Sequence, residues 1–129
     1  MGGIMKRIIL IVLTLLILGR NAWALEGYAT YYTIESCLRE GNTGITASGE
    51  QFDESKLTCA LRSRKFGREY VVYSPTTGRS VIVRHNDYGP GQGPLKRGVV
   101  IDLSPRAFRA VCGDLKQGKC LVNVQEVIG

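Results

Sequence analysis

Short runs of β-favouring residues, separated by turn-forming residues, recur along the chain after residue 26. They occupy residues 27–33, 57–62, 69–73, 80–84, 99–103 and 120–127. Runs of this length and composition predict strands. Six such strands in an open sheet would leave exposed edges, whereas a closed barrel pairs every edge. The sequence therefore predicts an all-β fold with one short helix, in which six strands form a barrel.

Two long segments interrupt the strand pattern. Residues 34–56 are polar and contain glycine, so we expect a long loop there. The second segment, residues 87–98, has three glycines and two prolines between positions 89 and 94. Such a composition argues against regular structure. Long loops in small domains often carry function, so this second segment is a candidate site region.

The sequence also predicts a hairpin and one short helix. Residues 74–79 (SPTTGR) lie between two predicted strands, and their Pro and Gly suit a hairpin turn. Ser104 is a typical N-cap residue and Pro105 suits the first helical position, so we expect a helix over residues 105–111. Gly113 is suited to end it.

The N-terminus has the pattern of a secretory signal peptide. Lys6 and Arg7 precede an apolar run at residues 8–18, and a small-residue cleavage pattern ends at Ala24. The run has eleven residues, too short for a helix to cross a hydrocarbon core of about 30 Å. We therefore expect residues 1–24 to be removed, leaving no stable membrane anchor and a periplasmic or extracellular protein.

The expected mature part, residues 25–129, has the length of one domain, and we expect it to be a monomer. Removal of the signal peptide lowers the basic count from 17 to 14 against 11 acidic residues, so the net charge falls from +6 to +3. A basic cluster remains at residues 62–68. Without a nucleic-acid motif, we interpret it as a solvated face or as attraction to an anionic wall polymer, with no nucleic-acid partner.

The mature part has an even number of cysteines: Cys37, Cys59, Cys112 and Cys120. In an oxidising compartment this predicts two disulfides, for which three pairings exist. We favour Cys37 with Cys59 and Cys112 with Cys120, because each pair joins neighbouring segments. A zinc site is the alternative, but the chain has no CxxC pair and one histidine, His85. The residues present require neither a metal nor an organic cofactor.

Four blocks of the sequence resemble the motifs of the rare lipoprotein A (RlpA) family. Residues 27–32 (GYATYY) are similar to its G-x-A-S-W-Y, and residues 46–53 (TASGEQFD) to its T-A-N-G-E-x-F-D. Residues 78–90 (GRSVIVRHNDYGP) resemble its G-R-S-V-x-V-R-I-N-D-R-G-P, and residues 101–104 match its I-D-L-S. The four blocks follow the family's order and span nearly the whole mature chain.

This resemblance implies a six-stranded double-psi β-barrel, a fold shared with expansins and barwin-like proteins. It also implies action on peptidoglycan glycan strands, which some family members cleave as lytic transglycosylases. In that reaction the C6 hydroxyl of N-acetylmuramic acid replaces water and closes a 1,6-anhydro ring. One acid can protonate the leaving oxygen and then take the hydroxyl proton, whereas a hydrolase normally needs a second carboxylate.

The candidate catalytic residues come from the motif blocks. Asp87 matches the Asp of N-D-x-G-P and is our candidate general acid/base, with Glu50 as a neighbour that would raise its pKa or bind a sugar hydroxyl. Alternatively, Asp87 caps the turn before Gly89. We interpret Asp102 as structural, because it lies beside the predicted helix cap.

Five further residues are candidates for substrate binding. Tyr32 and Tyr88 have aromatic faces that complement pyranose rings, although strand tyrosines are commonly partly buried framework. Asp53, Asn86 and His85 lie in the same motif blocks. For Asp53, a loop carboxylate that binds nearby backbone N–H groups is the favoured alternative.

One block departs from the family pattern. Residues 58–67 (TCALRSRKFG) stand where the family has T-A-A-H-R-T-L-P-F-G, so Leu61 replaces a His associated with the active site. His85 occupies a usual Ile position and is predicted to share a strand face with Asp87. One hypothesis is that His85 supplies, from a different position, the polar side chain that is missing at Leu61. The alternative is that His85 is a partly buried histidine with a local hydrogen bond. Besides the enzyme, two alternatives stay open: a non-catalytic expansin-like or barwin-like glycan binder, and a secreted effector or inhibitor.

Overall fold

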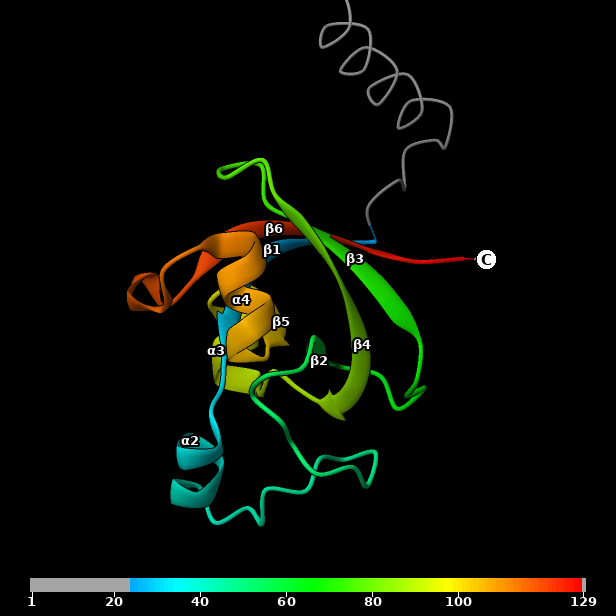
Figure 1. The fold of residues 1–129 in the computed structure, drawn as a ribbon, viewed down its shortest axis with the longest axis vertical. Helices are drawn as coiled ribbons and strands as arrows, with labels where there is room; N and C mark the ends of the chain where they lie inside the picture. Colours follow the sequence, from blue (N-terminus) through cyan, green and yellow to red (C-terminus); the bar gives the residue numbers. More distant parts are fainter. Residues whose placement is uncertain (1–23, 129) are drawn as a thin grey trace, which may run out of the picture.

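The computed structural model describes residues 24–128, in which six strands close into a barrel (Figure 1). The strands are β1 (Leu25–Tyr31), β2 (Thr58–Leu61), β3 (Glu69–Tyr73), β4 (Ser80–Tyr88), β5 (Val99–Leu103) and β6 (Cys120–Glu126). Their order around the barrel is β1-β5-β2-β4-β3-β6. The pairs β1–β5 and β2–β4 are parallel and the others antiparallel. The predicted six-stranded all-β barrel is confirmed; the predicted signal peptide lies outside the described residues, apart from Ala24.

Alternate strand residues fill the barrel. In β5, Val99, Ile101 and Leu103 are buried, while the residues between them are half-buried on the outer face. Helix α4 (Pro105–Cys112) closes one side of the core through Phe108, which is fully buried. The Ser104 hydroxyl accepts the N–H of Ala107, so the predicted N-cap is confirmed, and the helix is one residue longer than predicted.

Two segments predicted to lack regular structure contain short helices. Helix α2 (Ile34–Arg39) begins at Thr33, whose hydroxyl accepts the N–H of Ser36 while the Ser36 hydroxyl accepts that of Thr33. This reciprocal cap stabilises the start of a helix in a polar segment for which the composition had predicted a loop. Helix α3 (Gln92–Lys96) tolerates Pro94 because the first turn of a helix needs no internal N–H donor. A single 3-10 turn, η1 (Leu115–Gln117), precedes β6.

Strand β4 is longer than predicted. It runs to Tyr88, four residues beyond the expected end, so Asp87 and Tyr88 are strand residues. The register against β2 shifts along the way, because Cys59 pairs with His85 but Ala60 pairs with Asp87. The additional residue in β4 is a β-bulge, which interrupts the two-residue alternation of side chains.

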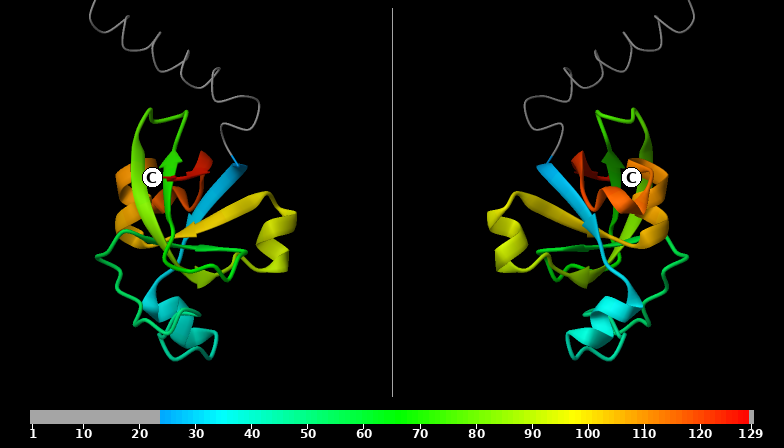
Figure 2. Two further views of the ribbon diagram at one scale, coloured as in Figure 1. Left: turned by 90° about the vertical axis from the view of Figure 1, so that its right-hand side faces the viewer. Right: turned by 90° about the vertical axis from the view of Figure 1, so that its left-hand side faces the viewer.

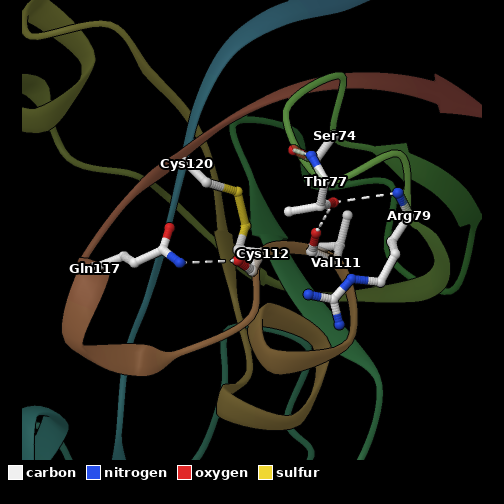
Figure 3. Close-up of a disulfide and its surroundings, with 7 residues drawn as sticks. All are labelled: Ser74, Thr77, Arg79, Val111, Cys112, Gln117 and Cys120. Atoms are coloured by element: carbon white, nitrogen blue, oxygen red, sulfur yellow. Dashed lines mark hydrogen bonds between the residues drawn. A yellow bond between two sulfur atoms is a disulfide. The ribbon is translucent and has the colours of Figure 1, made fainter.

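One predicted disulfide is confirmed and the other is wrong. Cys112 at the end of α4 is bonded to Cys120 at the start of β6, beside the hairpin residue Thr77 (Figure 3). Cys37 and Cys59 are free thiols. Cys59 is fully buried in the barrel core, whereas Cys37 lies on α2 in the wall of an external cavity. The two cysteines lie in neighbouring segments of the chain, but one side chain points into the core and the other lies outside the barrel, so they do not meet.

Within residues 24–128, no helix has the length and apolar character needed to span a membrane. The same residues hold no group of three or more His, Cys, Asp or Glu side chains arranged to bind a metal ion.

Candidate active site

A cavity of about 400 Å³ lies on the outer face of the barrel. The strand side of its lining includes Ala60, Asp87 and Asp102. The opposite side comes from α2 and from the segment 42–52, which project beyond the strands in two perpendicular views (Figures 1 and 2). The barrel thus supplies a rigid floor, and the connection between β1 and β2 supplies the facing wall.

Strand pairing places two carboxyl groups on either side of one small residue. Ala60 of β2 pairs with Asp102 of β5 on one side and with Asp87 of β4 on the other. Neighbouring strands lie about 4.8 Å apart, so the Cα atoms of the two aspartates are separated by about 10 Å. The methyl group of Ala60 leaves space between them, and all three residues line the cavity.

Asp102 is half-buried against β1. Its Oδ1 accepts the hydroxyl of Thr30, its pairing partner in β1, at 2.7 Å. Burial raises the pKa of Asp102 to about 6, the charge of Asp87 adds to the rise, and the Thr30 hydrogen bond opposes it. A carboxyl group in this range can both give and take a proton near neutral pH.

Asp87 is held by backbone donors from two segments. Its Oδ1 accepts the N–H of Ala47 and the N–H of Tyr88, each at 2.9 Å. The bond to Ala47 ties the segment 42–52 to the end of β4. The N–H of Gly89 donates to the backbone oxygen of Leu61, so Asp87 binds the N–H of the next residue, Tyr88, and does not cap the turn at Gly89.

Tyr32 lies against the same aspartate. Its ring stacks on Phe52, with centroids 4.3 Å apart and planes inclined by 16°. Its hydroxyl oxygen is buried and lies beside the carboxyl group of Asp87. Burial, followed by the negative charge of Asp87 and a hydrogen bond to its carboxyl group, raises the pKa of the hydroxyl far above its ordinary value. The hydroxyl therefore stays protonated, as a donor directed toward Asp87.

Four sequence-predicted site residues do not line the cavity. Glu50 makes a two-pronged ion pair with Arg84, and these hydrogen bonds lower the pKa of Glu50. It is therefore ionised and paired with Arg84 outside the cavity, and the role proposed for it beside Asp87 stays a prediction. Asp53 is exposed and binds the backbone and side chain of Ser55, as the alternative for it predicted. Asn86 is buried and contacts Glu50.

His85 is the fourth of these residues. It is fully buried, its Nε2 lies 2.9 Å from the backbone oxygen of Asp87, and its ring packs near Phe66 and Tyr70. The bulge in β4 means that His85 and Asp87 do not share a face, so that prediction is wrong. Leu61, at the position of the family His, is buried in the core cluster and also lies outside the cavity.

The sequence reasoning missed Asp102 as a cavity residue, although a signal was present. The apolar residues of β5 alternate, so a residue between them faces outward, and Asp102 is an acid at such a position. Cys37 and Glu40 also line the cavity, and they were hidden because α2 was not predicted. Burial raises the pKa of the Cys37 thiol, and the charges of Asp87 and Glu40 add to the rise.

Comparisons with known proteins agree with this architecture. A family model described as "Lytic transglycolase" matches residues 24–124. A probable endolytic peptidoglycan transglycosylase RlpA from Nostoc sp. is 45% identical over 84 residues, 65% of this chain and 21% of that protein. The chain thus spans about a fifth of that relative's length.

Two solved structures show the same fold at lower identity. The Streptomyces papain inhibitor has a TM-score of 0.59 and 24% identity, covering 81% of this chain and 94% of that one. A Clavibacter michiganensis expansin in complex with cellohexaose has a TM-score of 0.57 and 23% identity, covering 81% and 50%. The chain therefore belongs to the lytic transglycolase family and has the double-psi β-barrel fold of RlpA-like proteins.

Proposed function

We propose that this chain cleaves peptidoglycan glycan strands as a lytic transglycosylase, with Asp102 and Asp87 as its acid pair. The observation that supports this most strongly is the placement of the two carboxyl groups on either side of Ala60 in one cavity. Relatives named as endolytic peptidoglycan transglycosylases point to the same reaction.

The chemistry assigns a distinct role to each aspartate. With a pKa of about 6, Asp102 keeps roughly a tenth of its molecules protonated at pH 7. The protonated form donates to the leaving glycosidic oxygen, and the resulting carboxylate accepts the proton of the C6 hydroxyl as the 1,6-anhydro ring closes. Asp87, across Ala60, faces the positive charge that develops on the sugar ring.

Tyr32 is a third contributor in this proposal. Its buried hydroxyl lies beside the carboxyl group of Asp87, and the stack on Phe52 fixes its direction. A sugar hydroxyl that enters the cavity would compete for this donor. We therefore assign Tyr32 to substrate orientation, and Tyr88, which lines the rim, to contact with a sugar face.

The site of action follows from the substrate. Peptidoglycan lies outside the cytoplasmic membrane, so the proposed activity requires export. We propose that residues 1–24 direct this export and are removed, which releases a monomeric domain into the periplasm or the medium.

The test is mass spectrometry of the soluble products released from purified peptidoglycan. We expect 1,6-anhydro-N-acetylmuramic acid ends from the parent, and a loss of about 100-fold or more in Asp102→Asn and in Asp87→Asn. Asp53→Asn is the matched control, because Asp53 is an exposed aspartate outside the cavity. Water-derived reducing ends in place of anhydro ends would contradict the mechanism.

A non-catalytic glycan binder is the second candidate. Two observations favour it: Leu61 stands where the family has an active-site His, and an expansin with this fold is seen in complex with cellohexaose. In that case folded protein would be pulled down by the glycan, and neither the parent nor any aspartate variant would release soluble products.

A further inference from the structure

Two arginine side chains lie over the ring of Tyr88, which lines the cavity, and we call this edge of the cavity its rim. The guanidinium carbon of Arg64 lies 4.5 Å from the centre of the Tyr88 ring, and that of Arg62 lies 5.6 Å from it. Arg62 Nη1 also donates to the backbone oxygen of Pro90 at 2.8 Å. Neither arginine lines the cavity itself, and Arg62 lines a second pocket together with Leu61 and Leu95. Tyr88 and Pro90 do line the cavity, so their contacts with the arginines hold two positive charges next to it.

Neither charge is neutralised in the part of the chain that the structure describes. The ion pairs found there, at Arg68 and Arg84, involve other residues. Arg62 and Arg64 are both exposed, and the adjacent Lys65 adds a third exposed cation. The rim therefore carries positive charge that no protein carboxylate balances.

The floor and the facing wall of the same cavity carry acidic residues. Asp87 and Asp102 lie on the strands and Glu40 lies at the end of α2. An anionic group would be repelled from the floor and attracted to the rim, so the charge pattern fixes the direction in which an anionic ligand enters. A guanidinium group stacked on an aromatic ring keeps its N–H edge free for a carboxylate, which it can bind through two parallel hydrogen bonds.

We propose that Arg62, Tyr88 and Arg64 form a subsite for a carboxylate carried by the glycan strand. This inference rests on the proposed function, because it assigns the ligand of that same cavity. Peptidoglycan offers two sources of such a carboxylate. One is the lactyl ether of a muramic acid that has lost its stem peptide, and the other is an attached stem peptide.

Binding measurements on the full mature chain test the subsite. Asp102→Asn serves as the background, so that strands are bound without being cleaved. The ligands are soluble stem-free strands, stem-bearing strands, and stem-free strands whose carboxyl groups have been reduced to alcohols. We expect the stem-free strands to bind about tenfold more tightly than their reduced form, with an affinity that falls as salt is added.

Substitution of Arg64 gives the sharper comparison. We expect Arg64→Gln to weaken binding of carboxylate-bearing strands by about tenfold and to leave the reduced strands within about twofold. The matched control is Lys119→Gln, because the Lys119 ammonium also lies over a tyrosine ring, 4.4 Å from the centre of Tyr28, and Tyr28, unlike Tyr88, does not line the cavity. Arg64→Lys should restore part of the preference, since it keeps the charge.

Each outcome decides the inference. A larger loss on stem-free than on stem-bearing strands assigns the lactyl carboxylate, and the reverse assigns the stem peptide. An effect of Arg64→Gln on carboxylate-bearing strands that is no larger than the effect of Lys119→Gln, or no binding to any strand, would overturn the subsite. Product analysis of the parent is separate: without anhydro-ended products the proposed cleavage fails, while a carboxylate preference in binding would still stand.

Discussion

At the scale of single residues, the cavity depends on the different surroundings of two like groups. Asp87 receives two backbone N–H donors on one oxygen, whereas Asp102 receives one hydroxyl, from Thr30 of β1. Burial raises the pKa of Asp102 to about 6, a value that suits an acid or base role near neutral pH. Ala60 preserves the space between them, so a larger side chain there would fill the cavity between the two carboxyl groups.

The raised pKa of Asp102 has a consequence for stability. The carboxyl releases its proton at about pH 6 in the folded chain but near its ordinary value of 3.8 when unfolded. Between these values the folded state holds more protons, so the free energy of unfolding should fall as the pH rises from about 4 to 6. We expect Asp102→Asn, which removes this titration, to be more stable than the parent at pH 7 by on the order of 1–3 kcal/mol.

Urea denaturation at pH 4 and pH 7 measures this effect. Near pH 4 the folded parent has a protonated, neutral Asp102, so the variant and the parent should then differ little. Asp53→Asn is again the control, since Asp53 is exposed and the hydrogen bonds to Ser55 lower its pKa. A stability difference between Asp102→Asn and the parent that is the same at both pH values would show that Asp102 does not titrate in this range.

The two free thiols should differ in accessibility. Cys37 is partly exposed and lines the cavity, whereas Cys59 is fully buried and burial strongly raises its pKa. We expect a maleimide to modify Cys37 in the native chain and Cys59 only after unfolding. Peptide mapping by mass spectrometry identifies the modified residue. If the glycan binds in the cavity, the Cys37 adduct should also block glycan binding. Unimpaired binding by the adduct would contradict the proposal that the cavity is the glycan-binding site.

At the scale of the strands, the approach of β1 to β5 positions the acid. Gly27 lies where an added Cβ would stand 2.6 Å from the backbone oxygen of Gly98 and 2.8 Å from a methyl carbon of Val100. The oxygen of Gly98 also accepts the N–H of Tyr28 at 2.9 Å. The absence of a side chain at Gly27 thus lets β1 pair closely with β5, which in turn brings Thr30 to Asp102.

Gly27→Ala should separate the two strands. Because the contact is with backbone as well as side chain, we expect a loss of about 1–3 kcal/mol in the free energy of unfolding. Gly93→Ala is the control, since its Cβ would meet only the end of the Arg97 side chain, at 3.5 Å, and it lies within α3. Chemical denaturation of both variants checks this, and a neutral Gly27→Ala would mean that the barrel absorbs the methyl group without strain.

At the scale of the whole molecule, stability should come mainly from closure of the barrel. The disulfide joins cysteines only eight positions apart, so chain entropy assigns it about 2 kcal/mol. Beside it, Thr77 donates to the backbone oxygen of Val111 at 2.7 Å and holds the hairpin to α4 (Figure 3). The replacement of Cys112 and Cys120 by Ser should therefore lower stability by about 2 kcal/mol and leave a folded domain, as circular dichroism and thermal unfolding can show. Complete unfolding at 25 °C would contradict this.

The sequence predicted the barrel better than it predicted the cavity. The strands, the hairpin and helix α4 depend on local composition and on the alternation of apolar residues. Strands such as residues 69–73 and 99–103 could therefore be predicted directly from the sequence. The cavity depends on which residues meet across strands, and a single bulge near His85 changes that pairing. Helix α2 was missed because its signal is a hydrogen-bonded cap between Thr33 and Ser36 and not a hydrophobic period.

The division of the cavity between barrel and connection has one more consequence. The acids stand on strands whose every edge is paired, whereas the facing wall is formed by α2 and by the segment 42–52, outside the barrel. A change in the length or sequence of that connection would reshape the binding surface without disturbing the strands that carry the reactive groups. The molecule therefore separates, within one domain, a fixed strand framework from a wall whose shape can change independently of it.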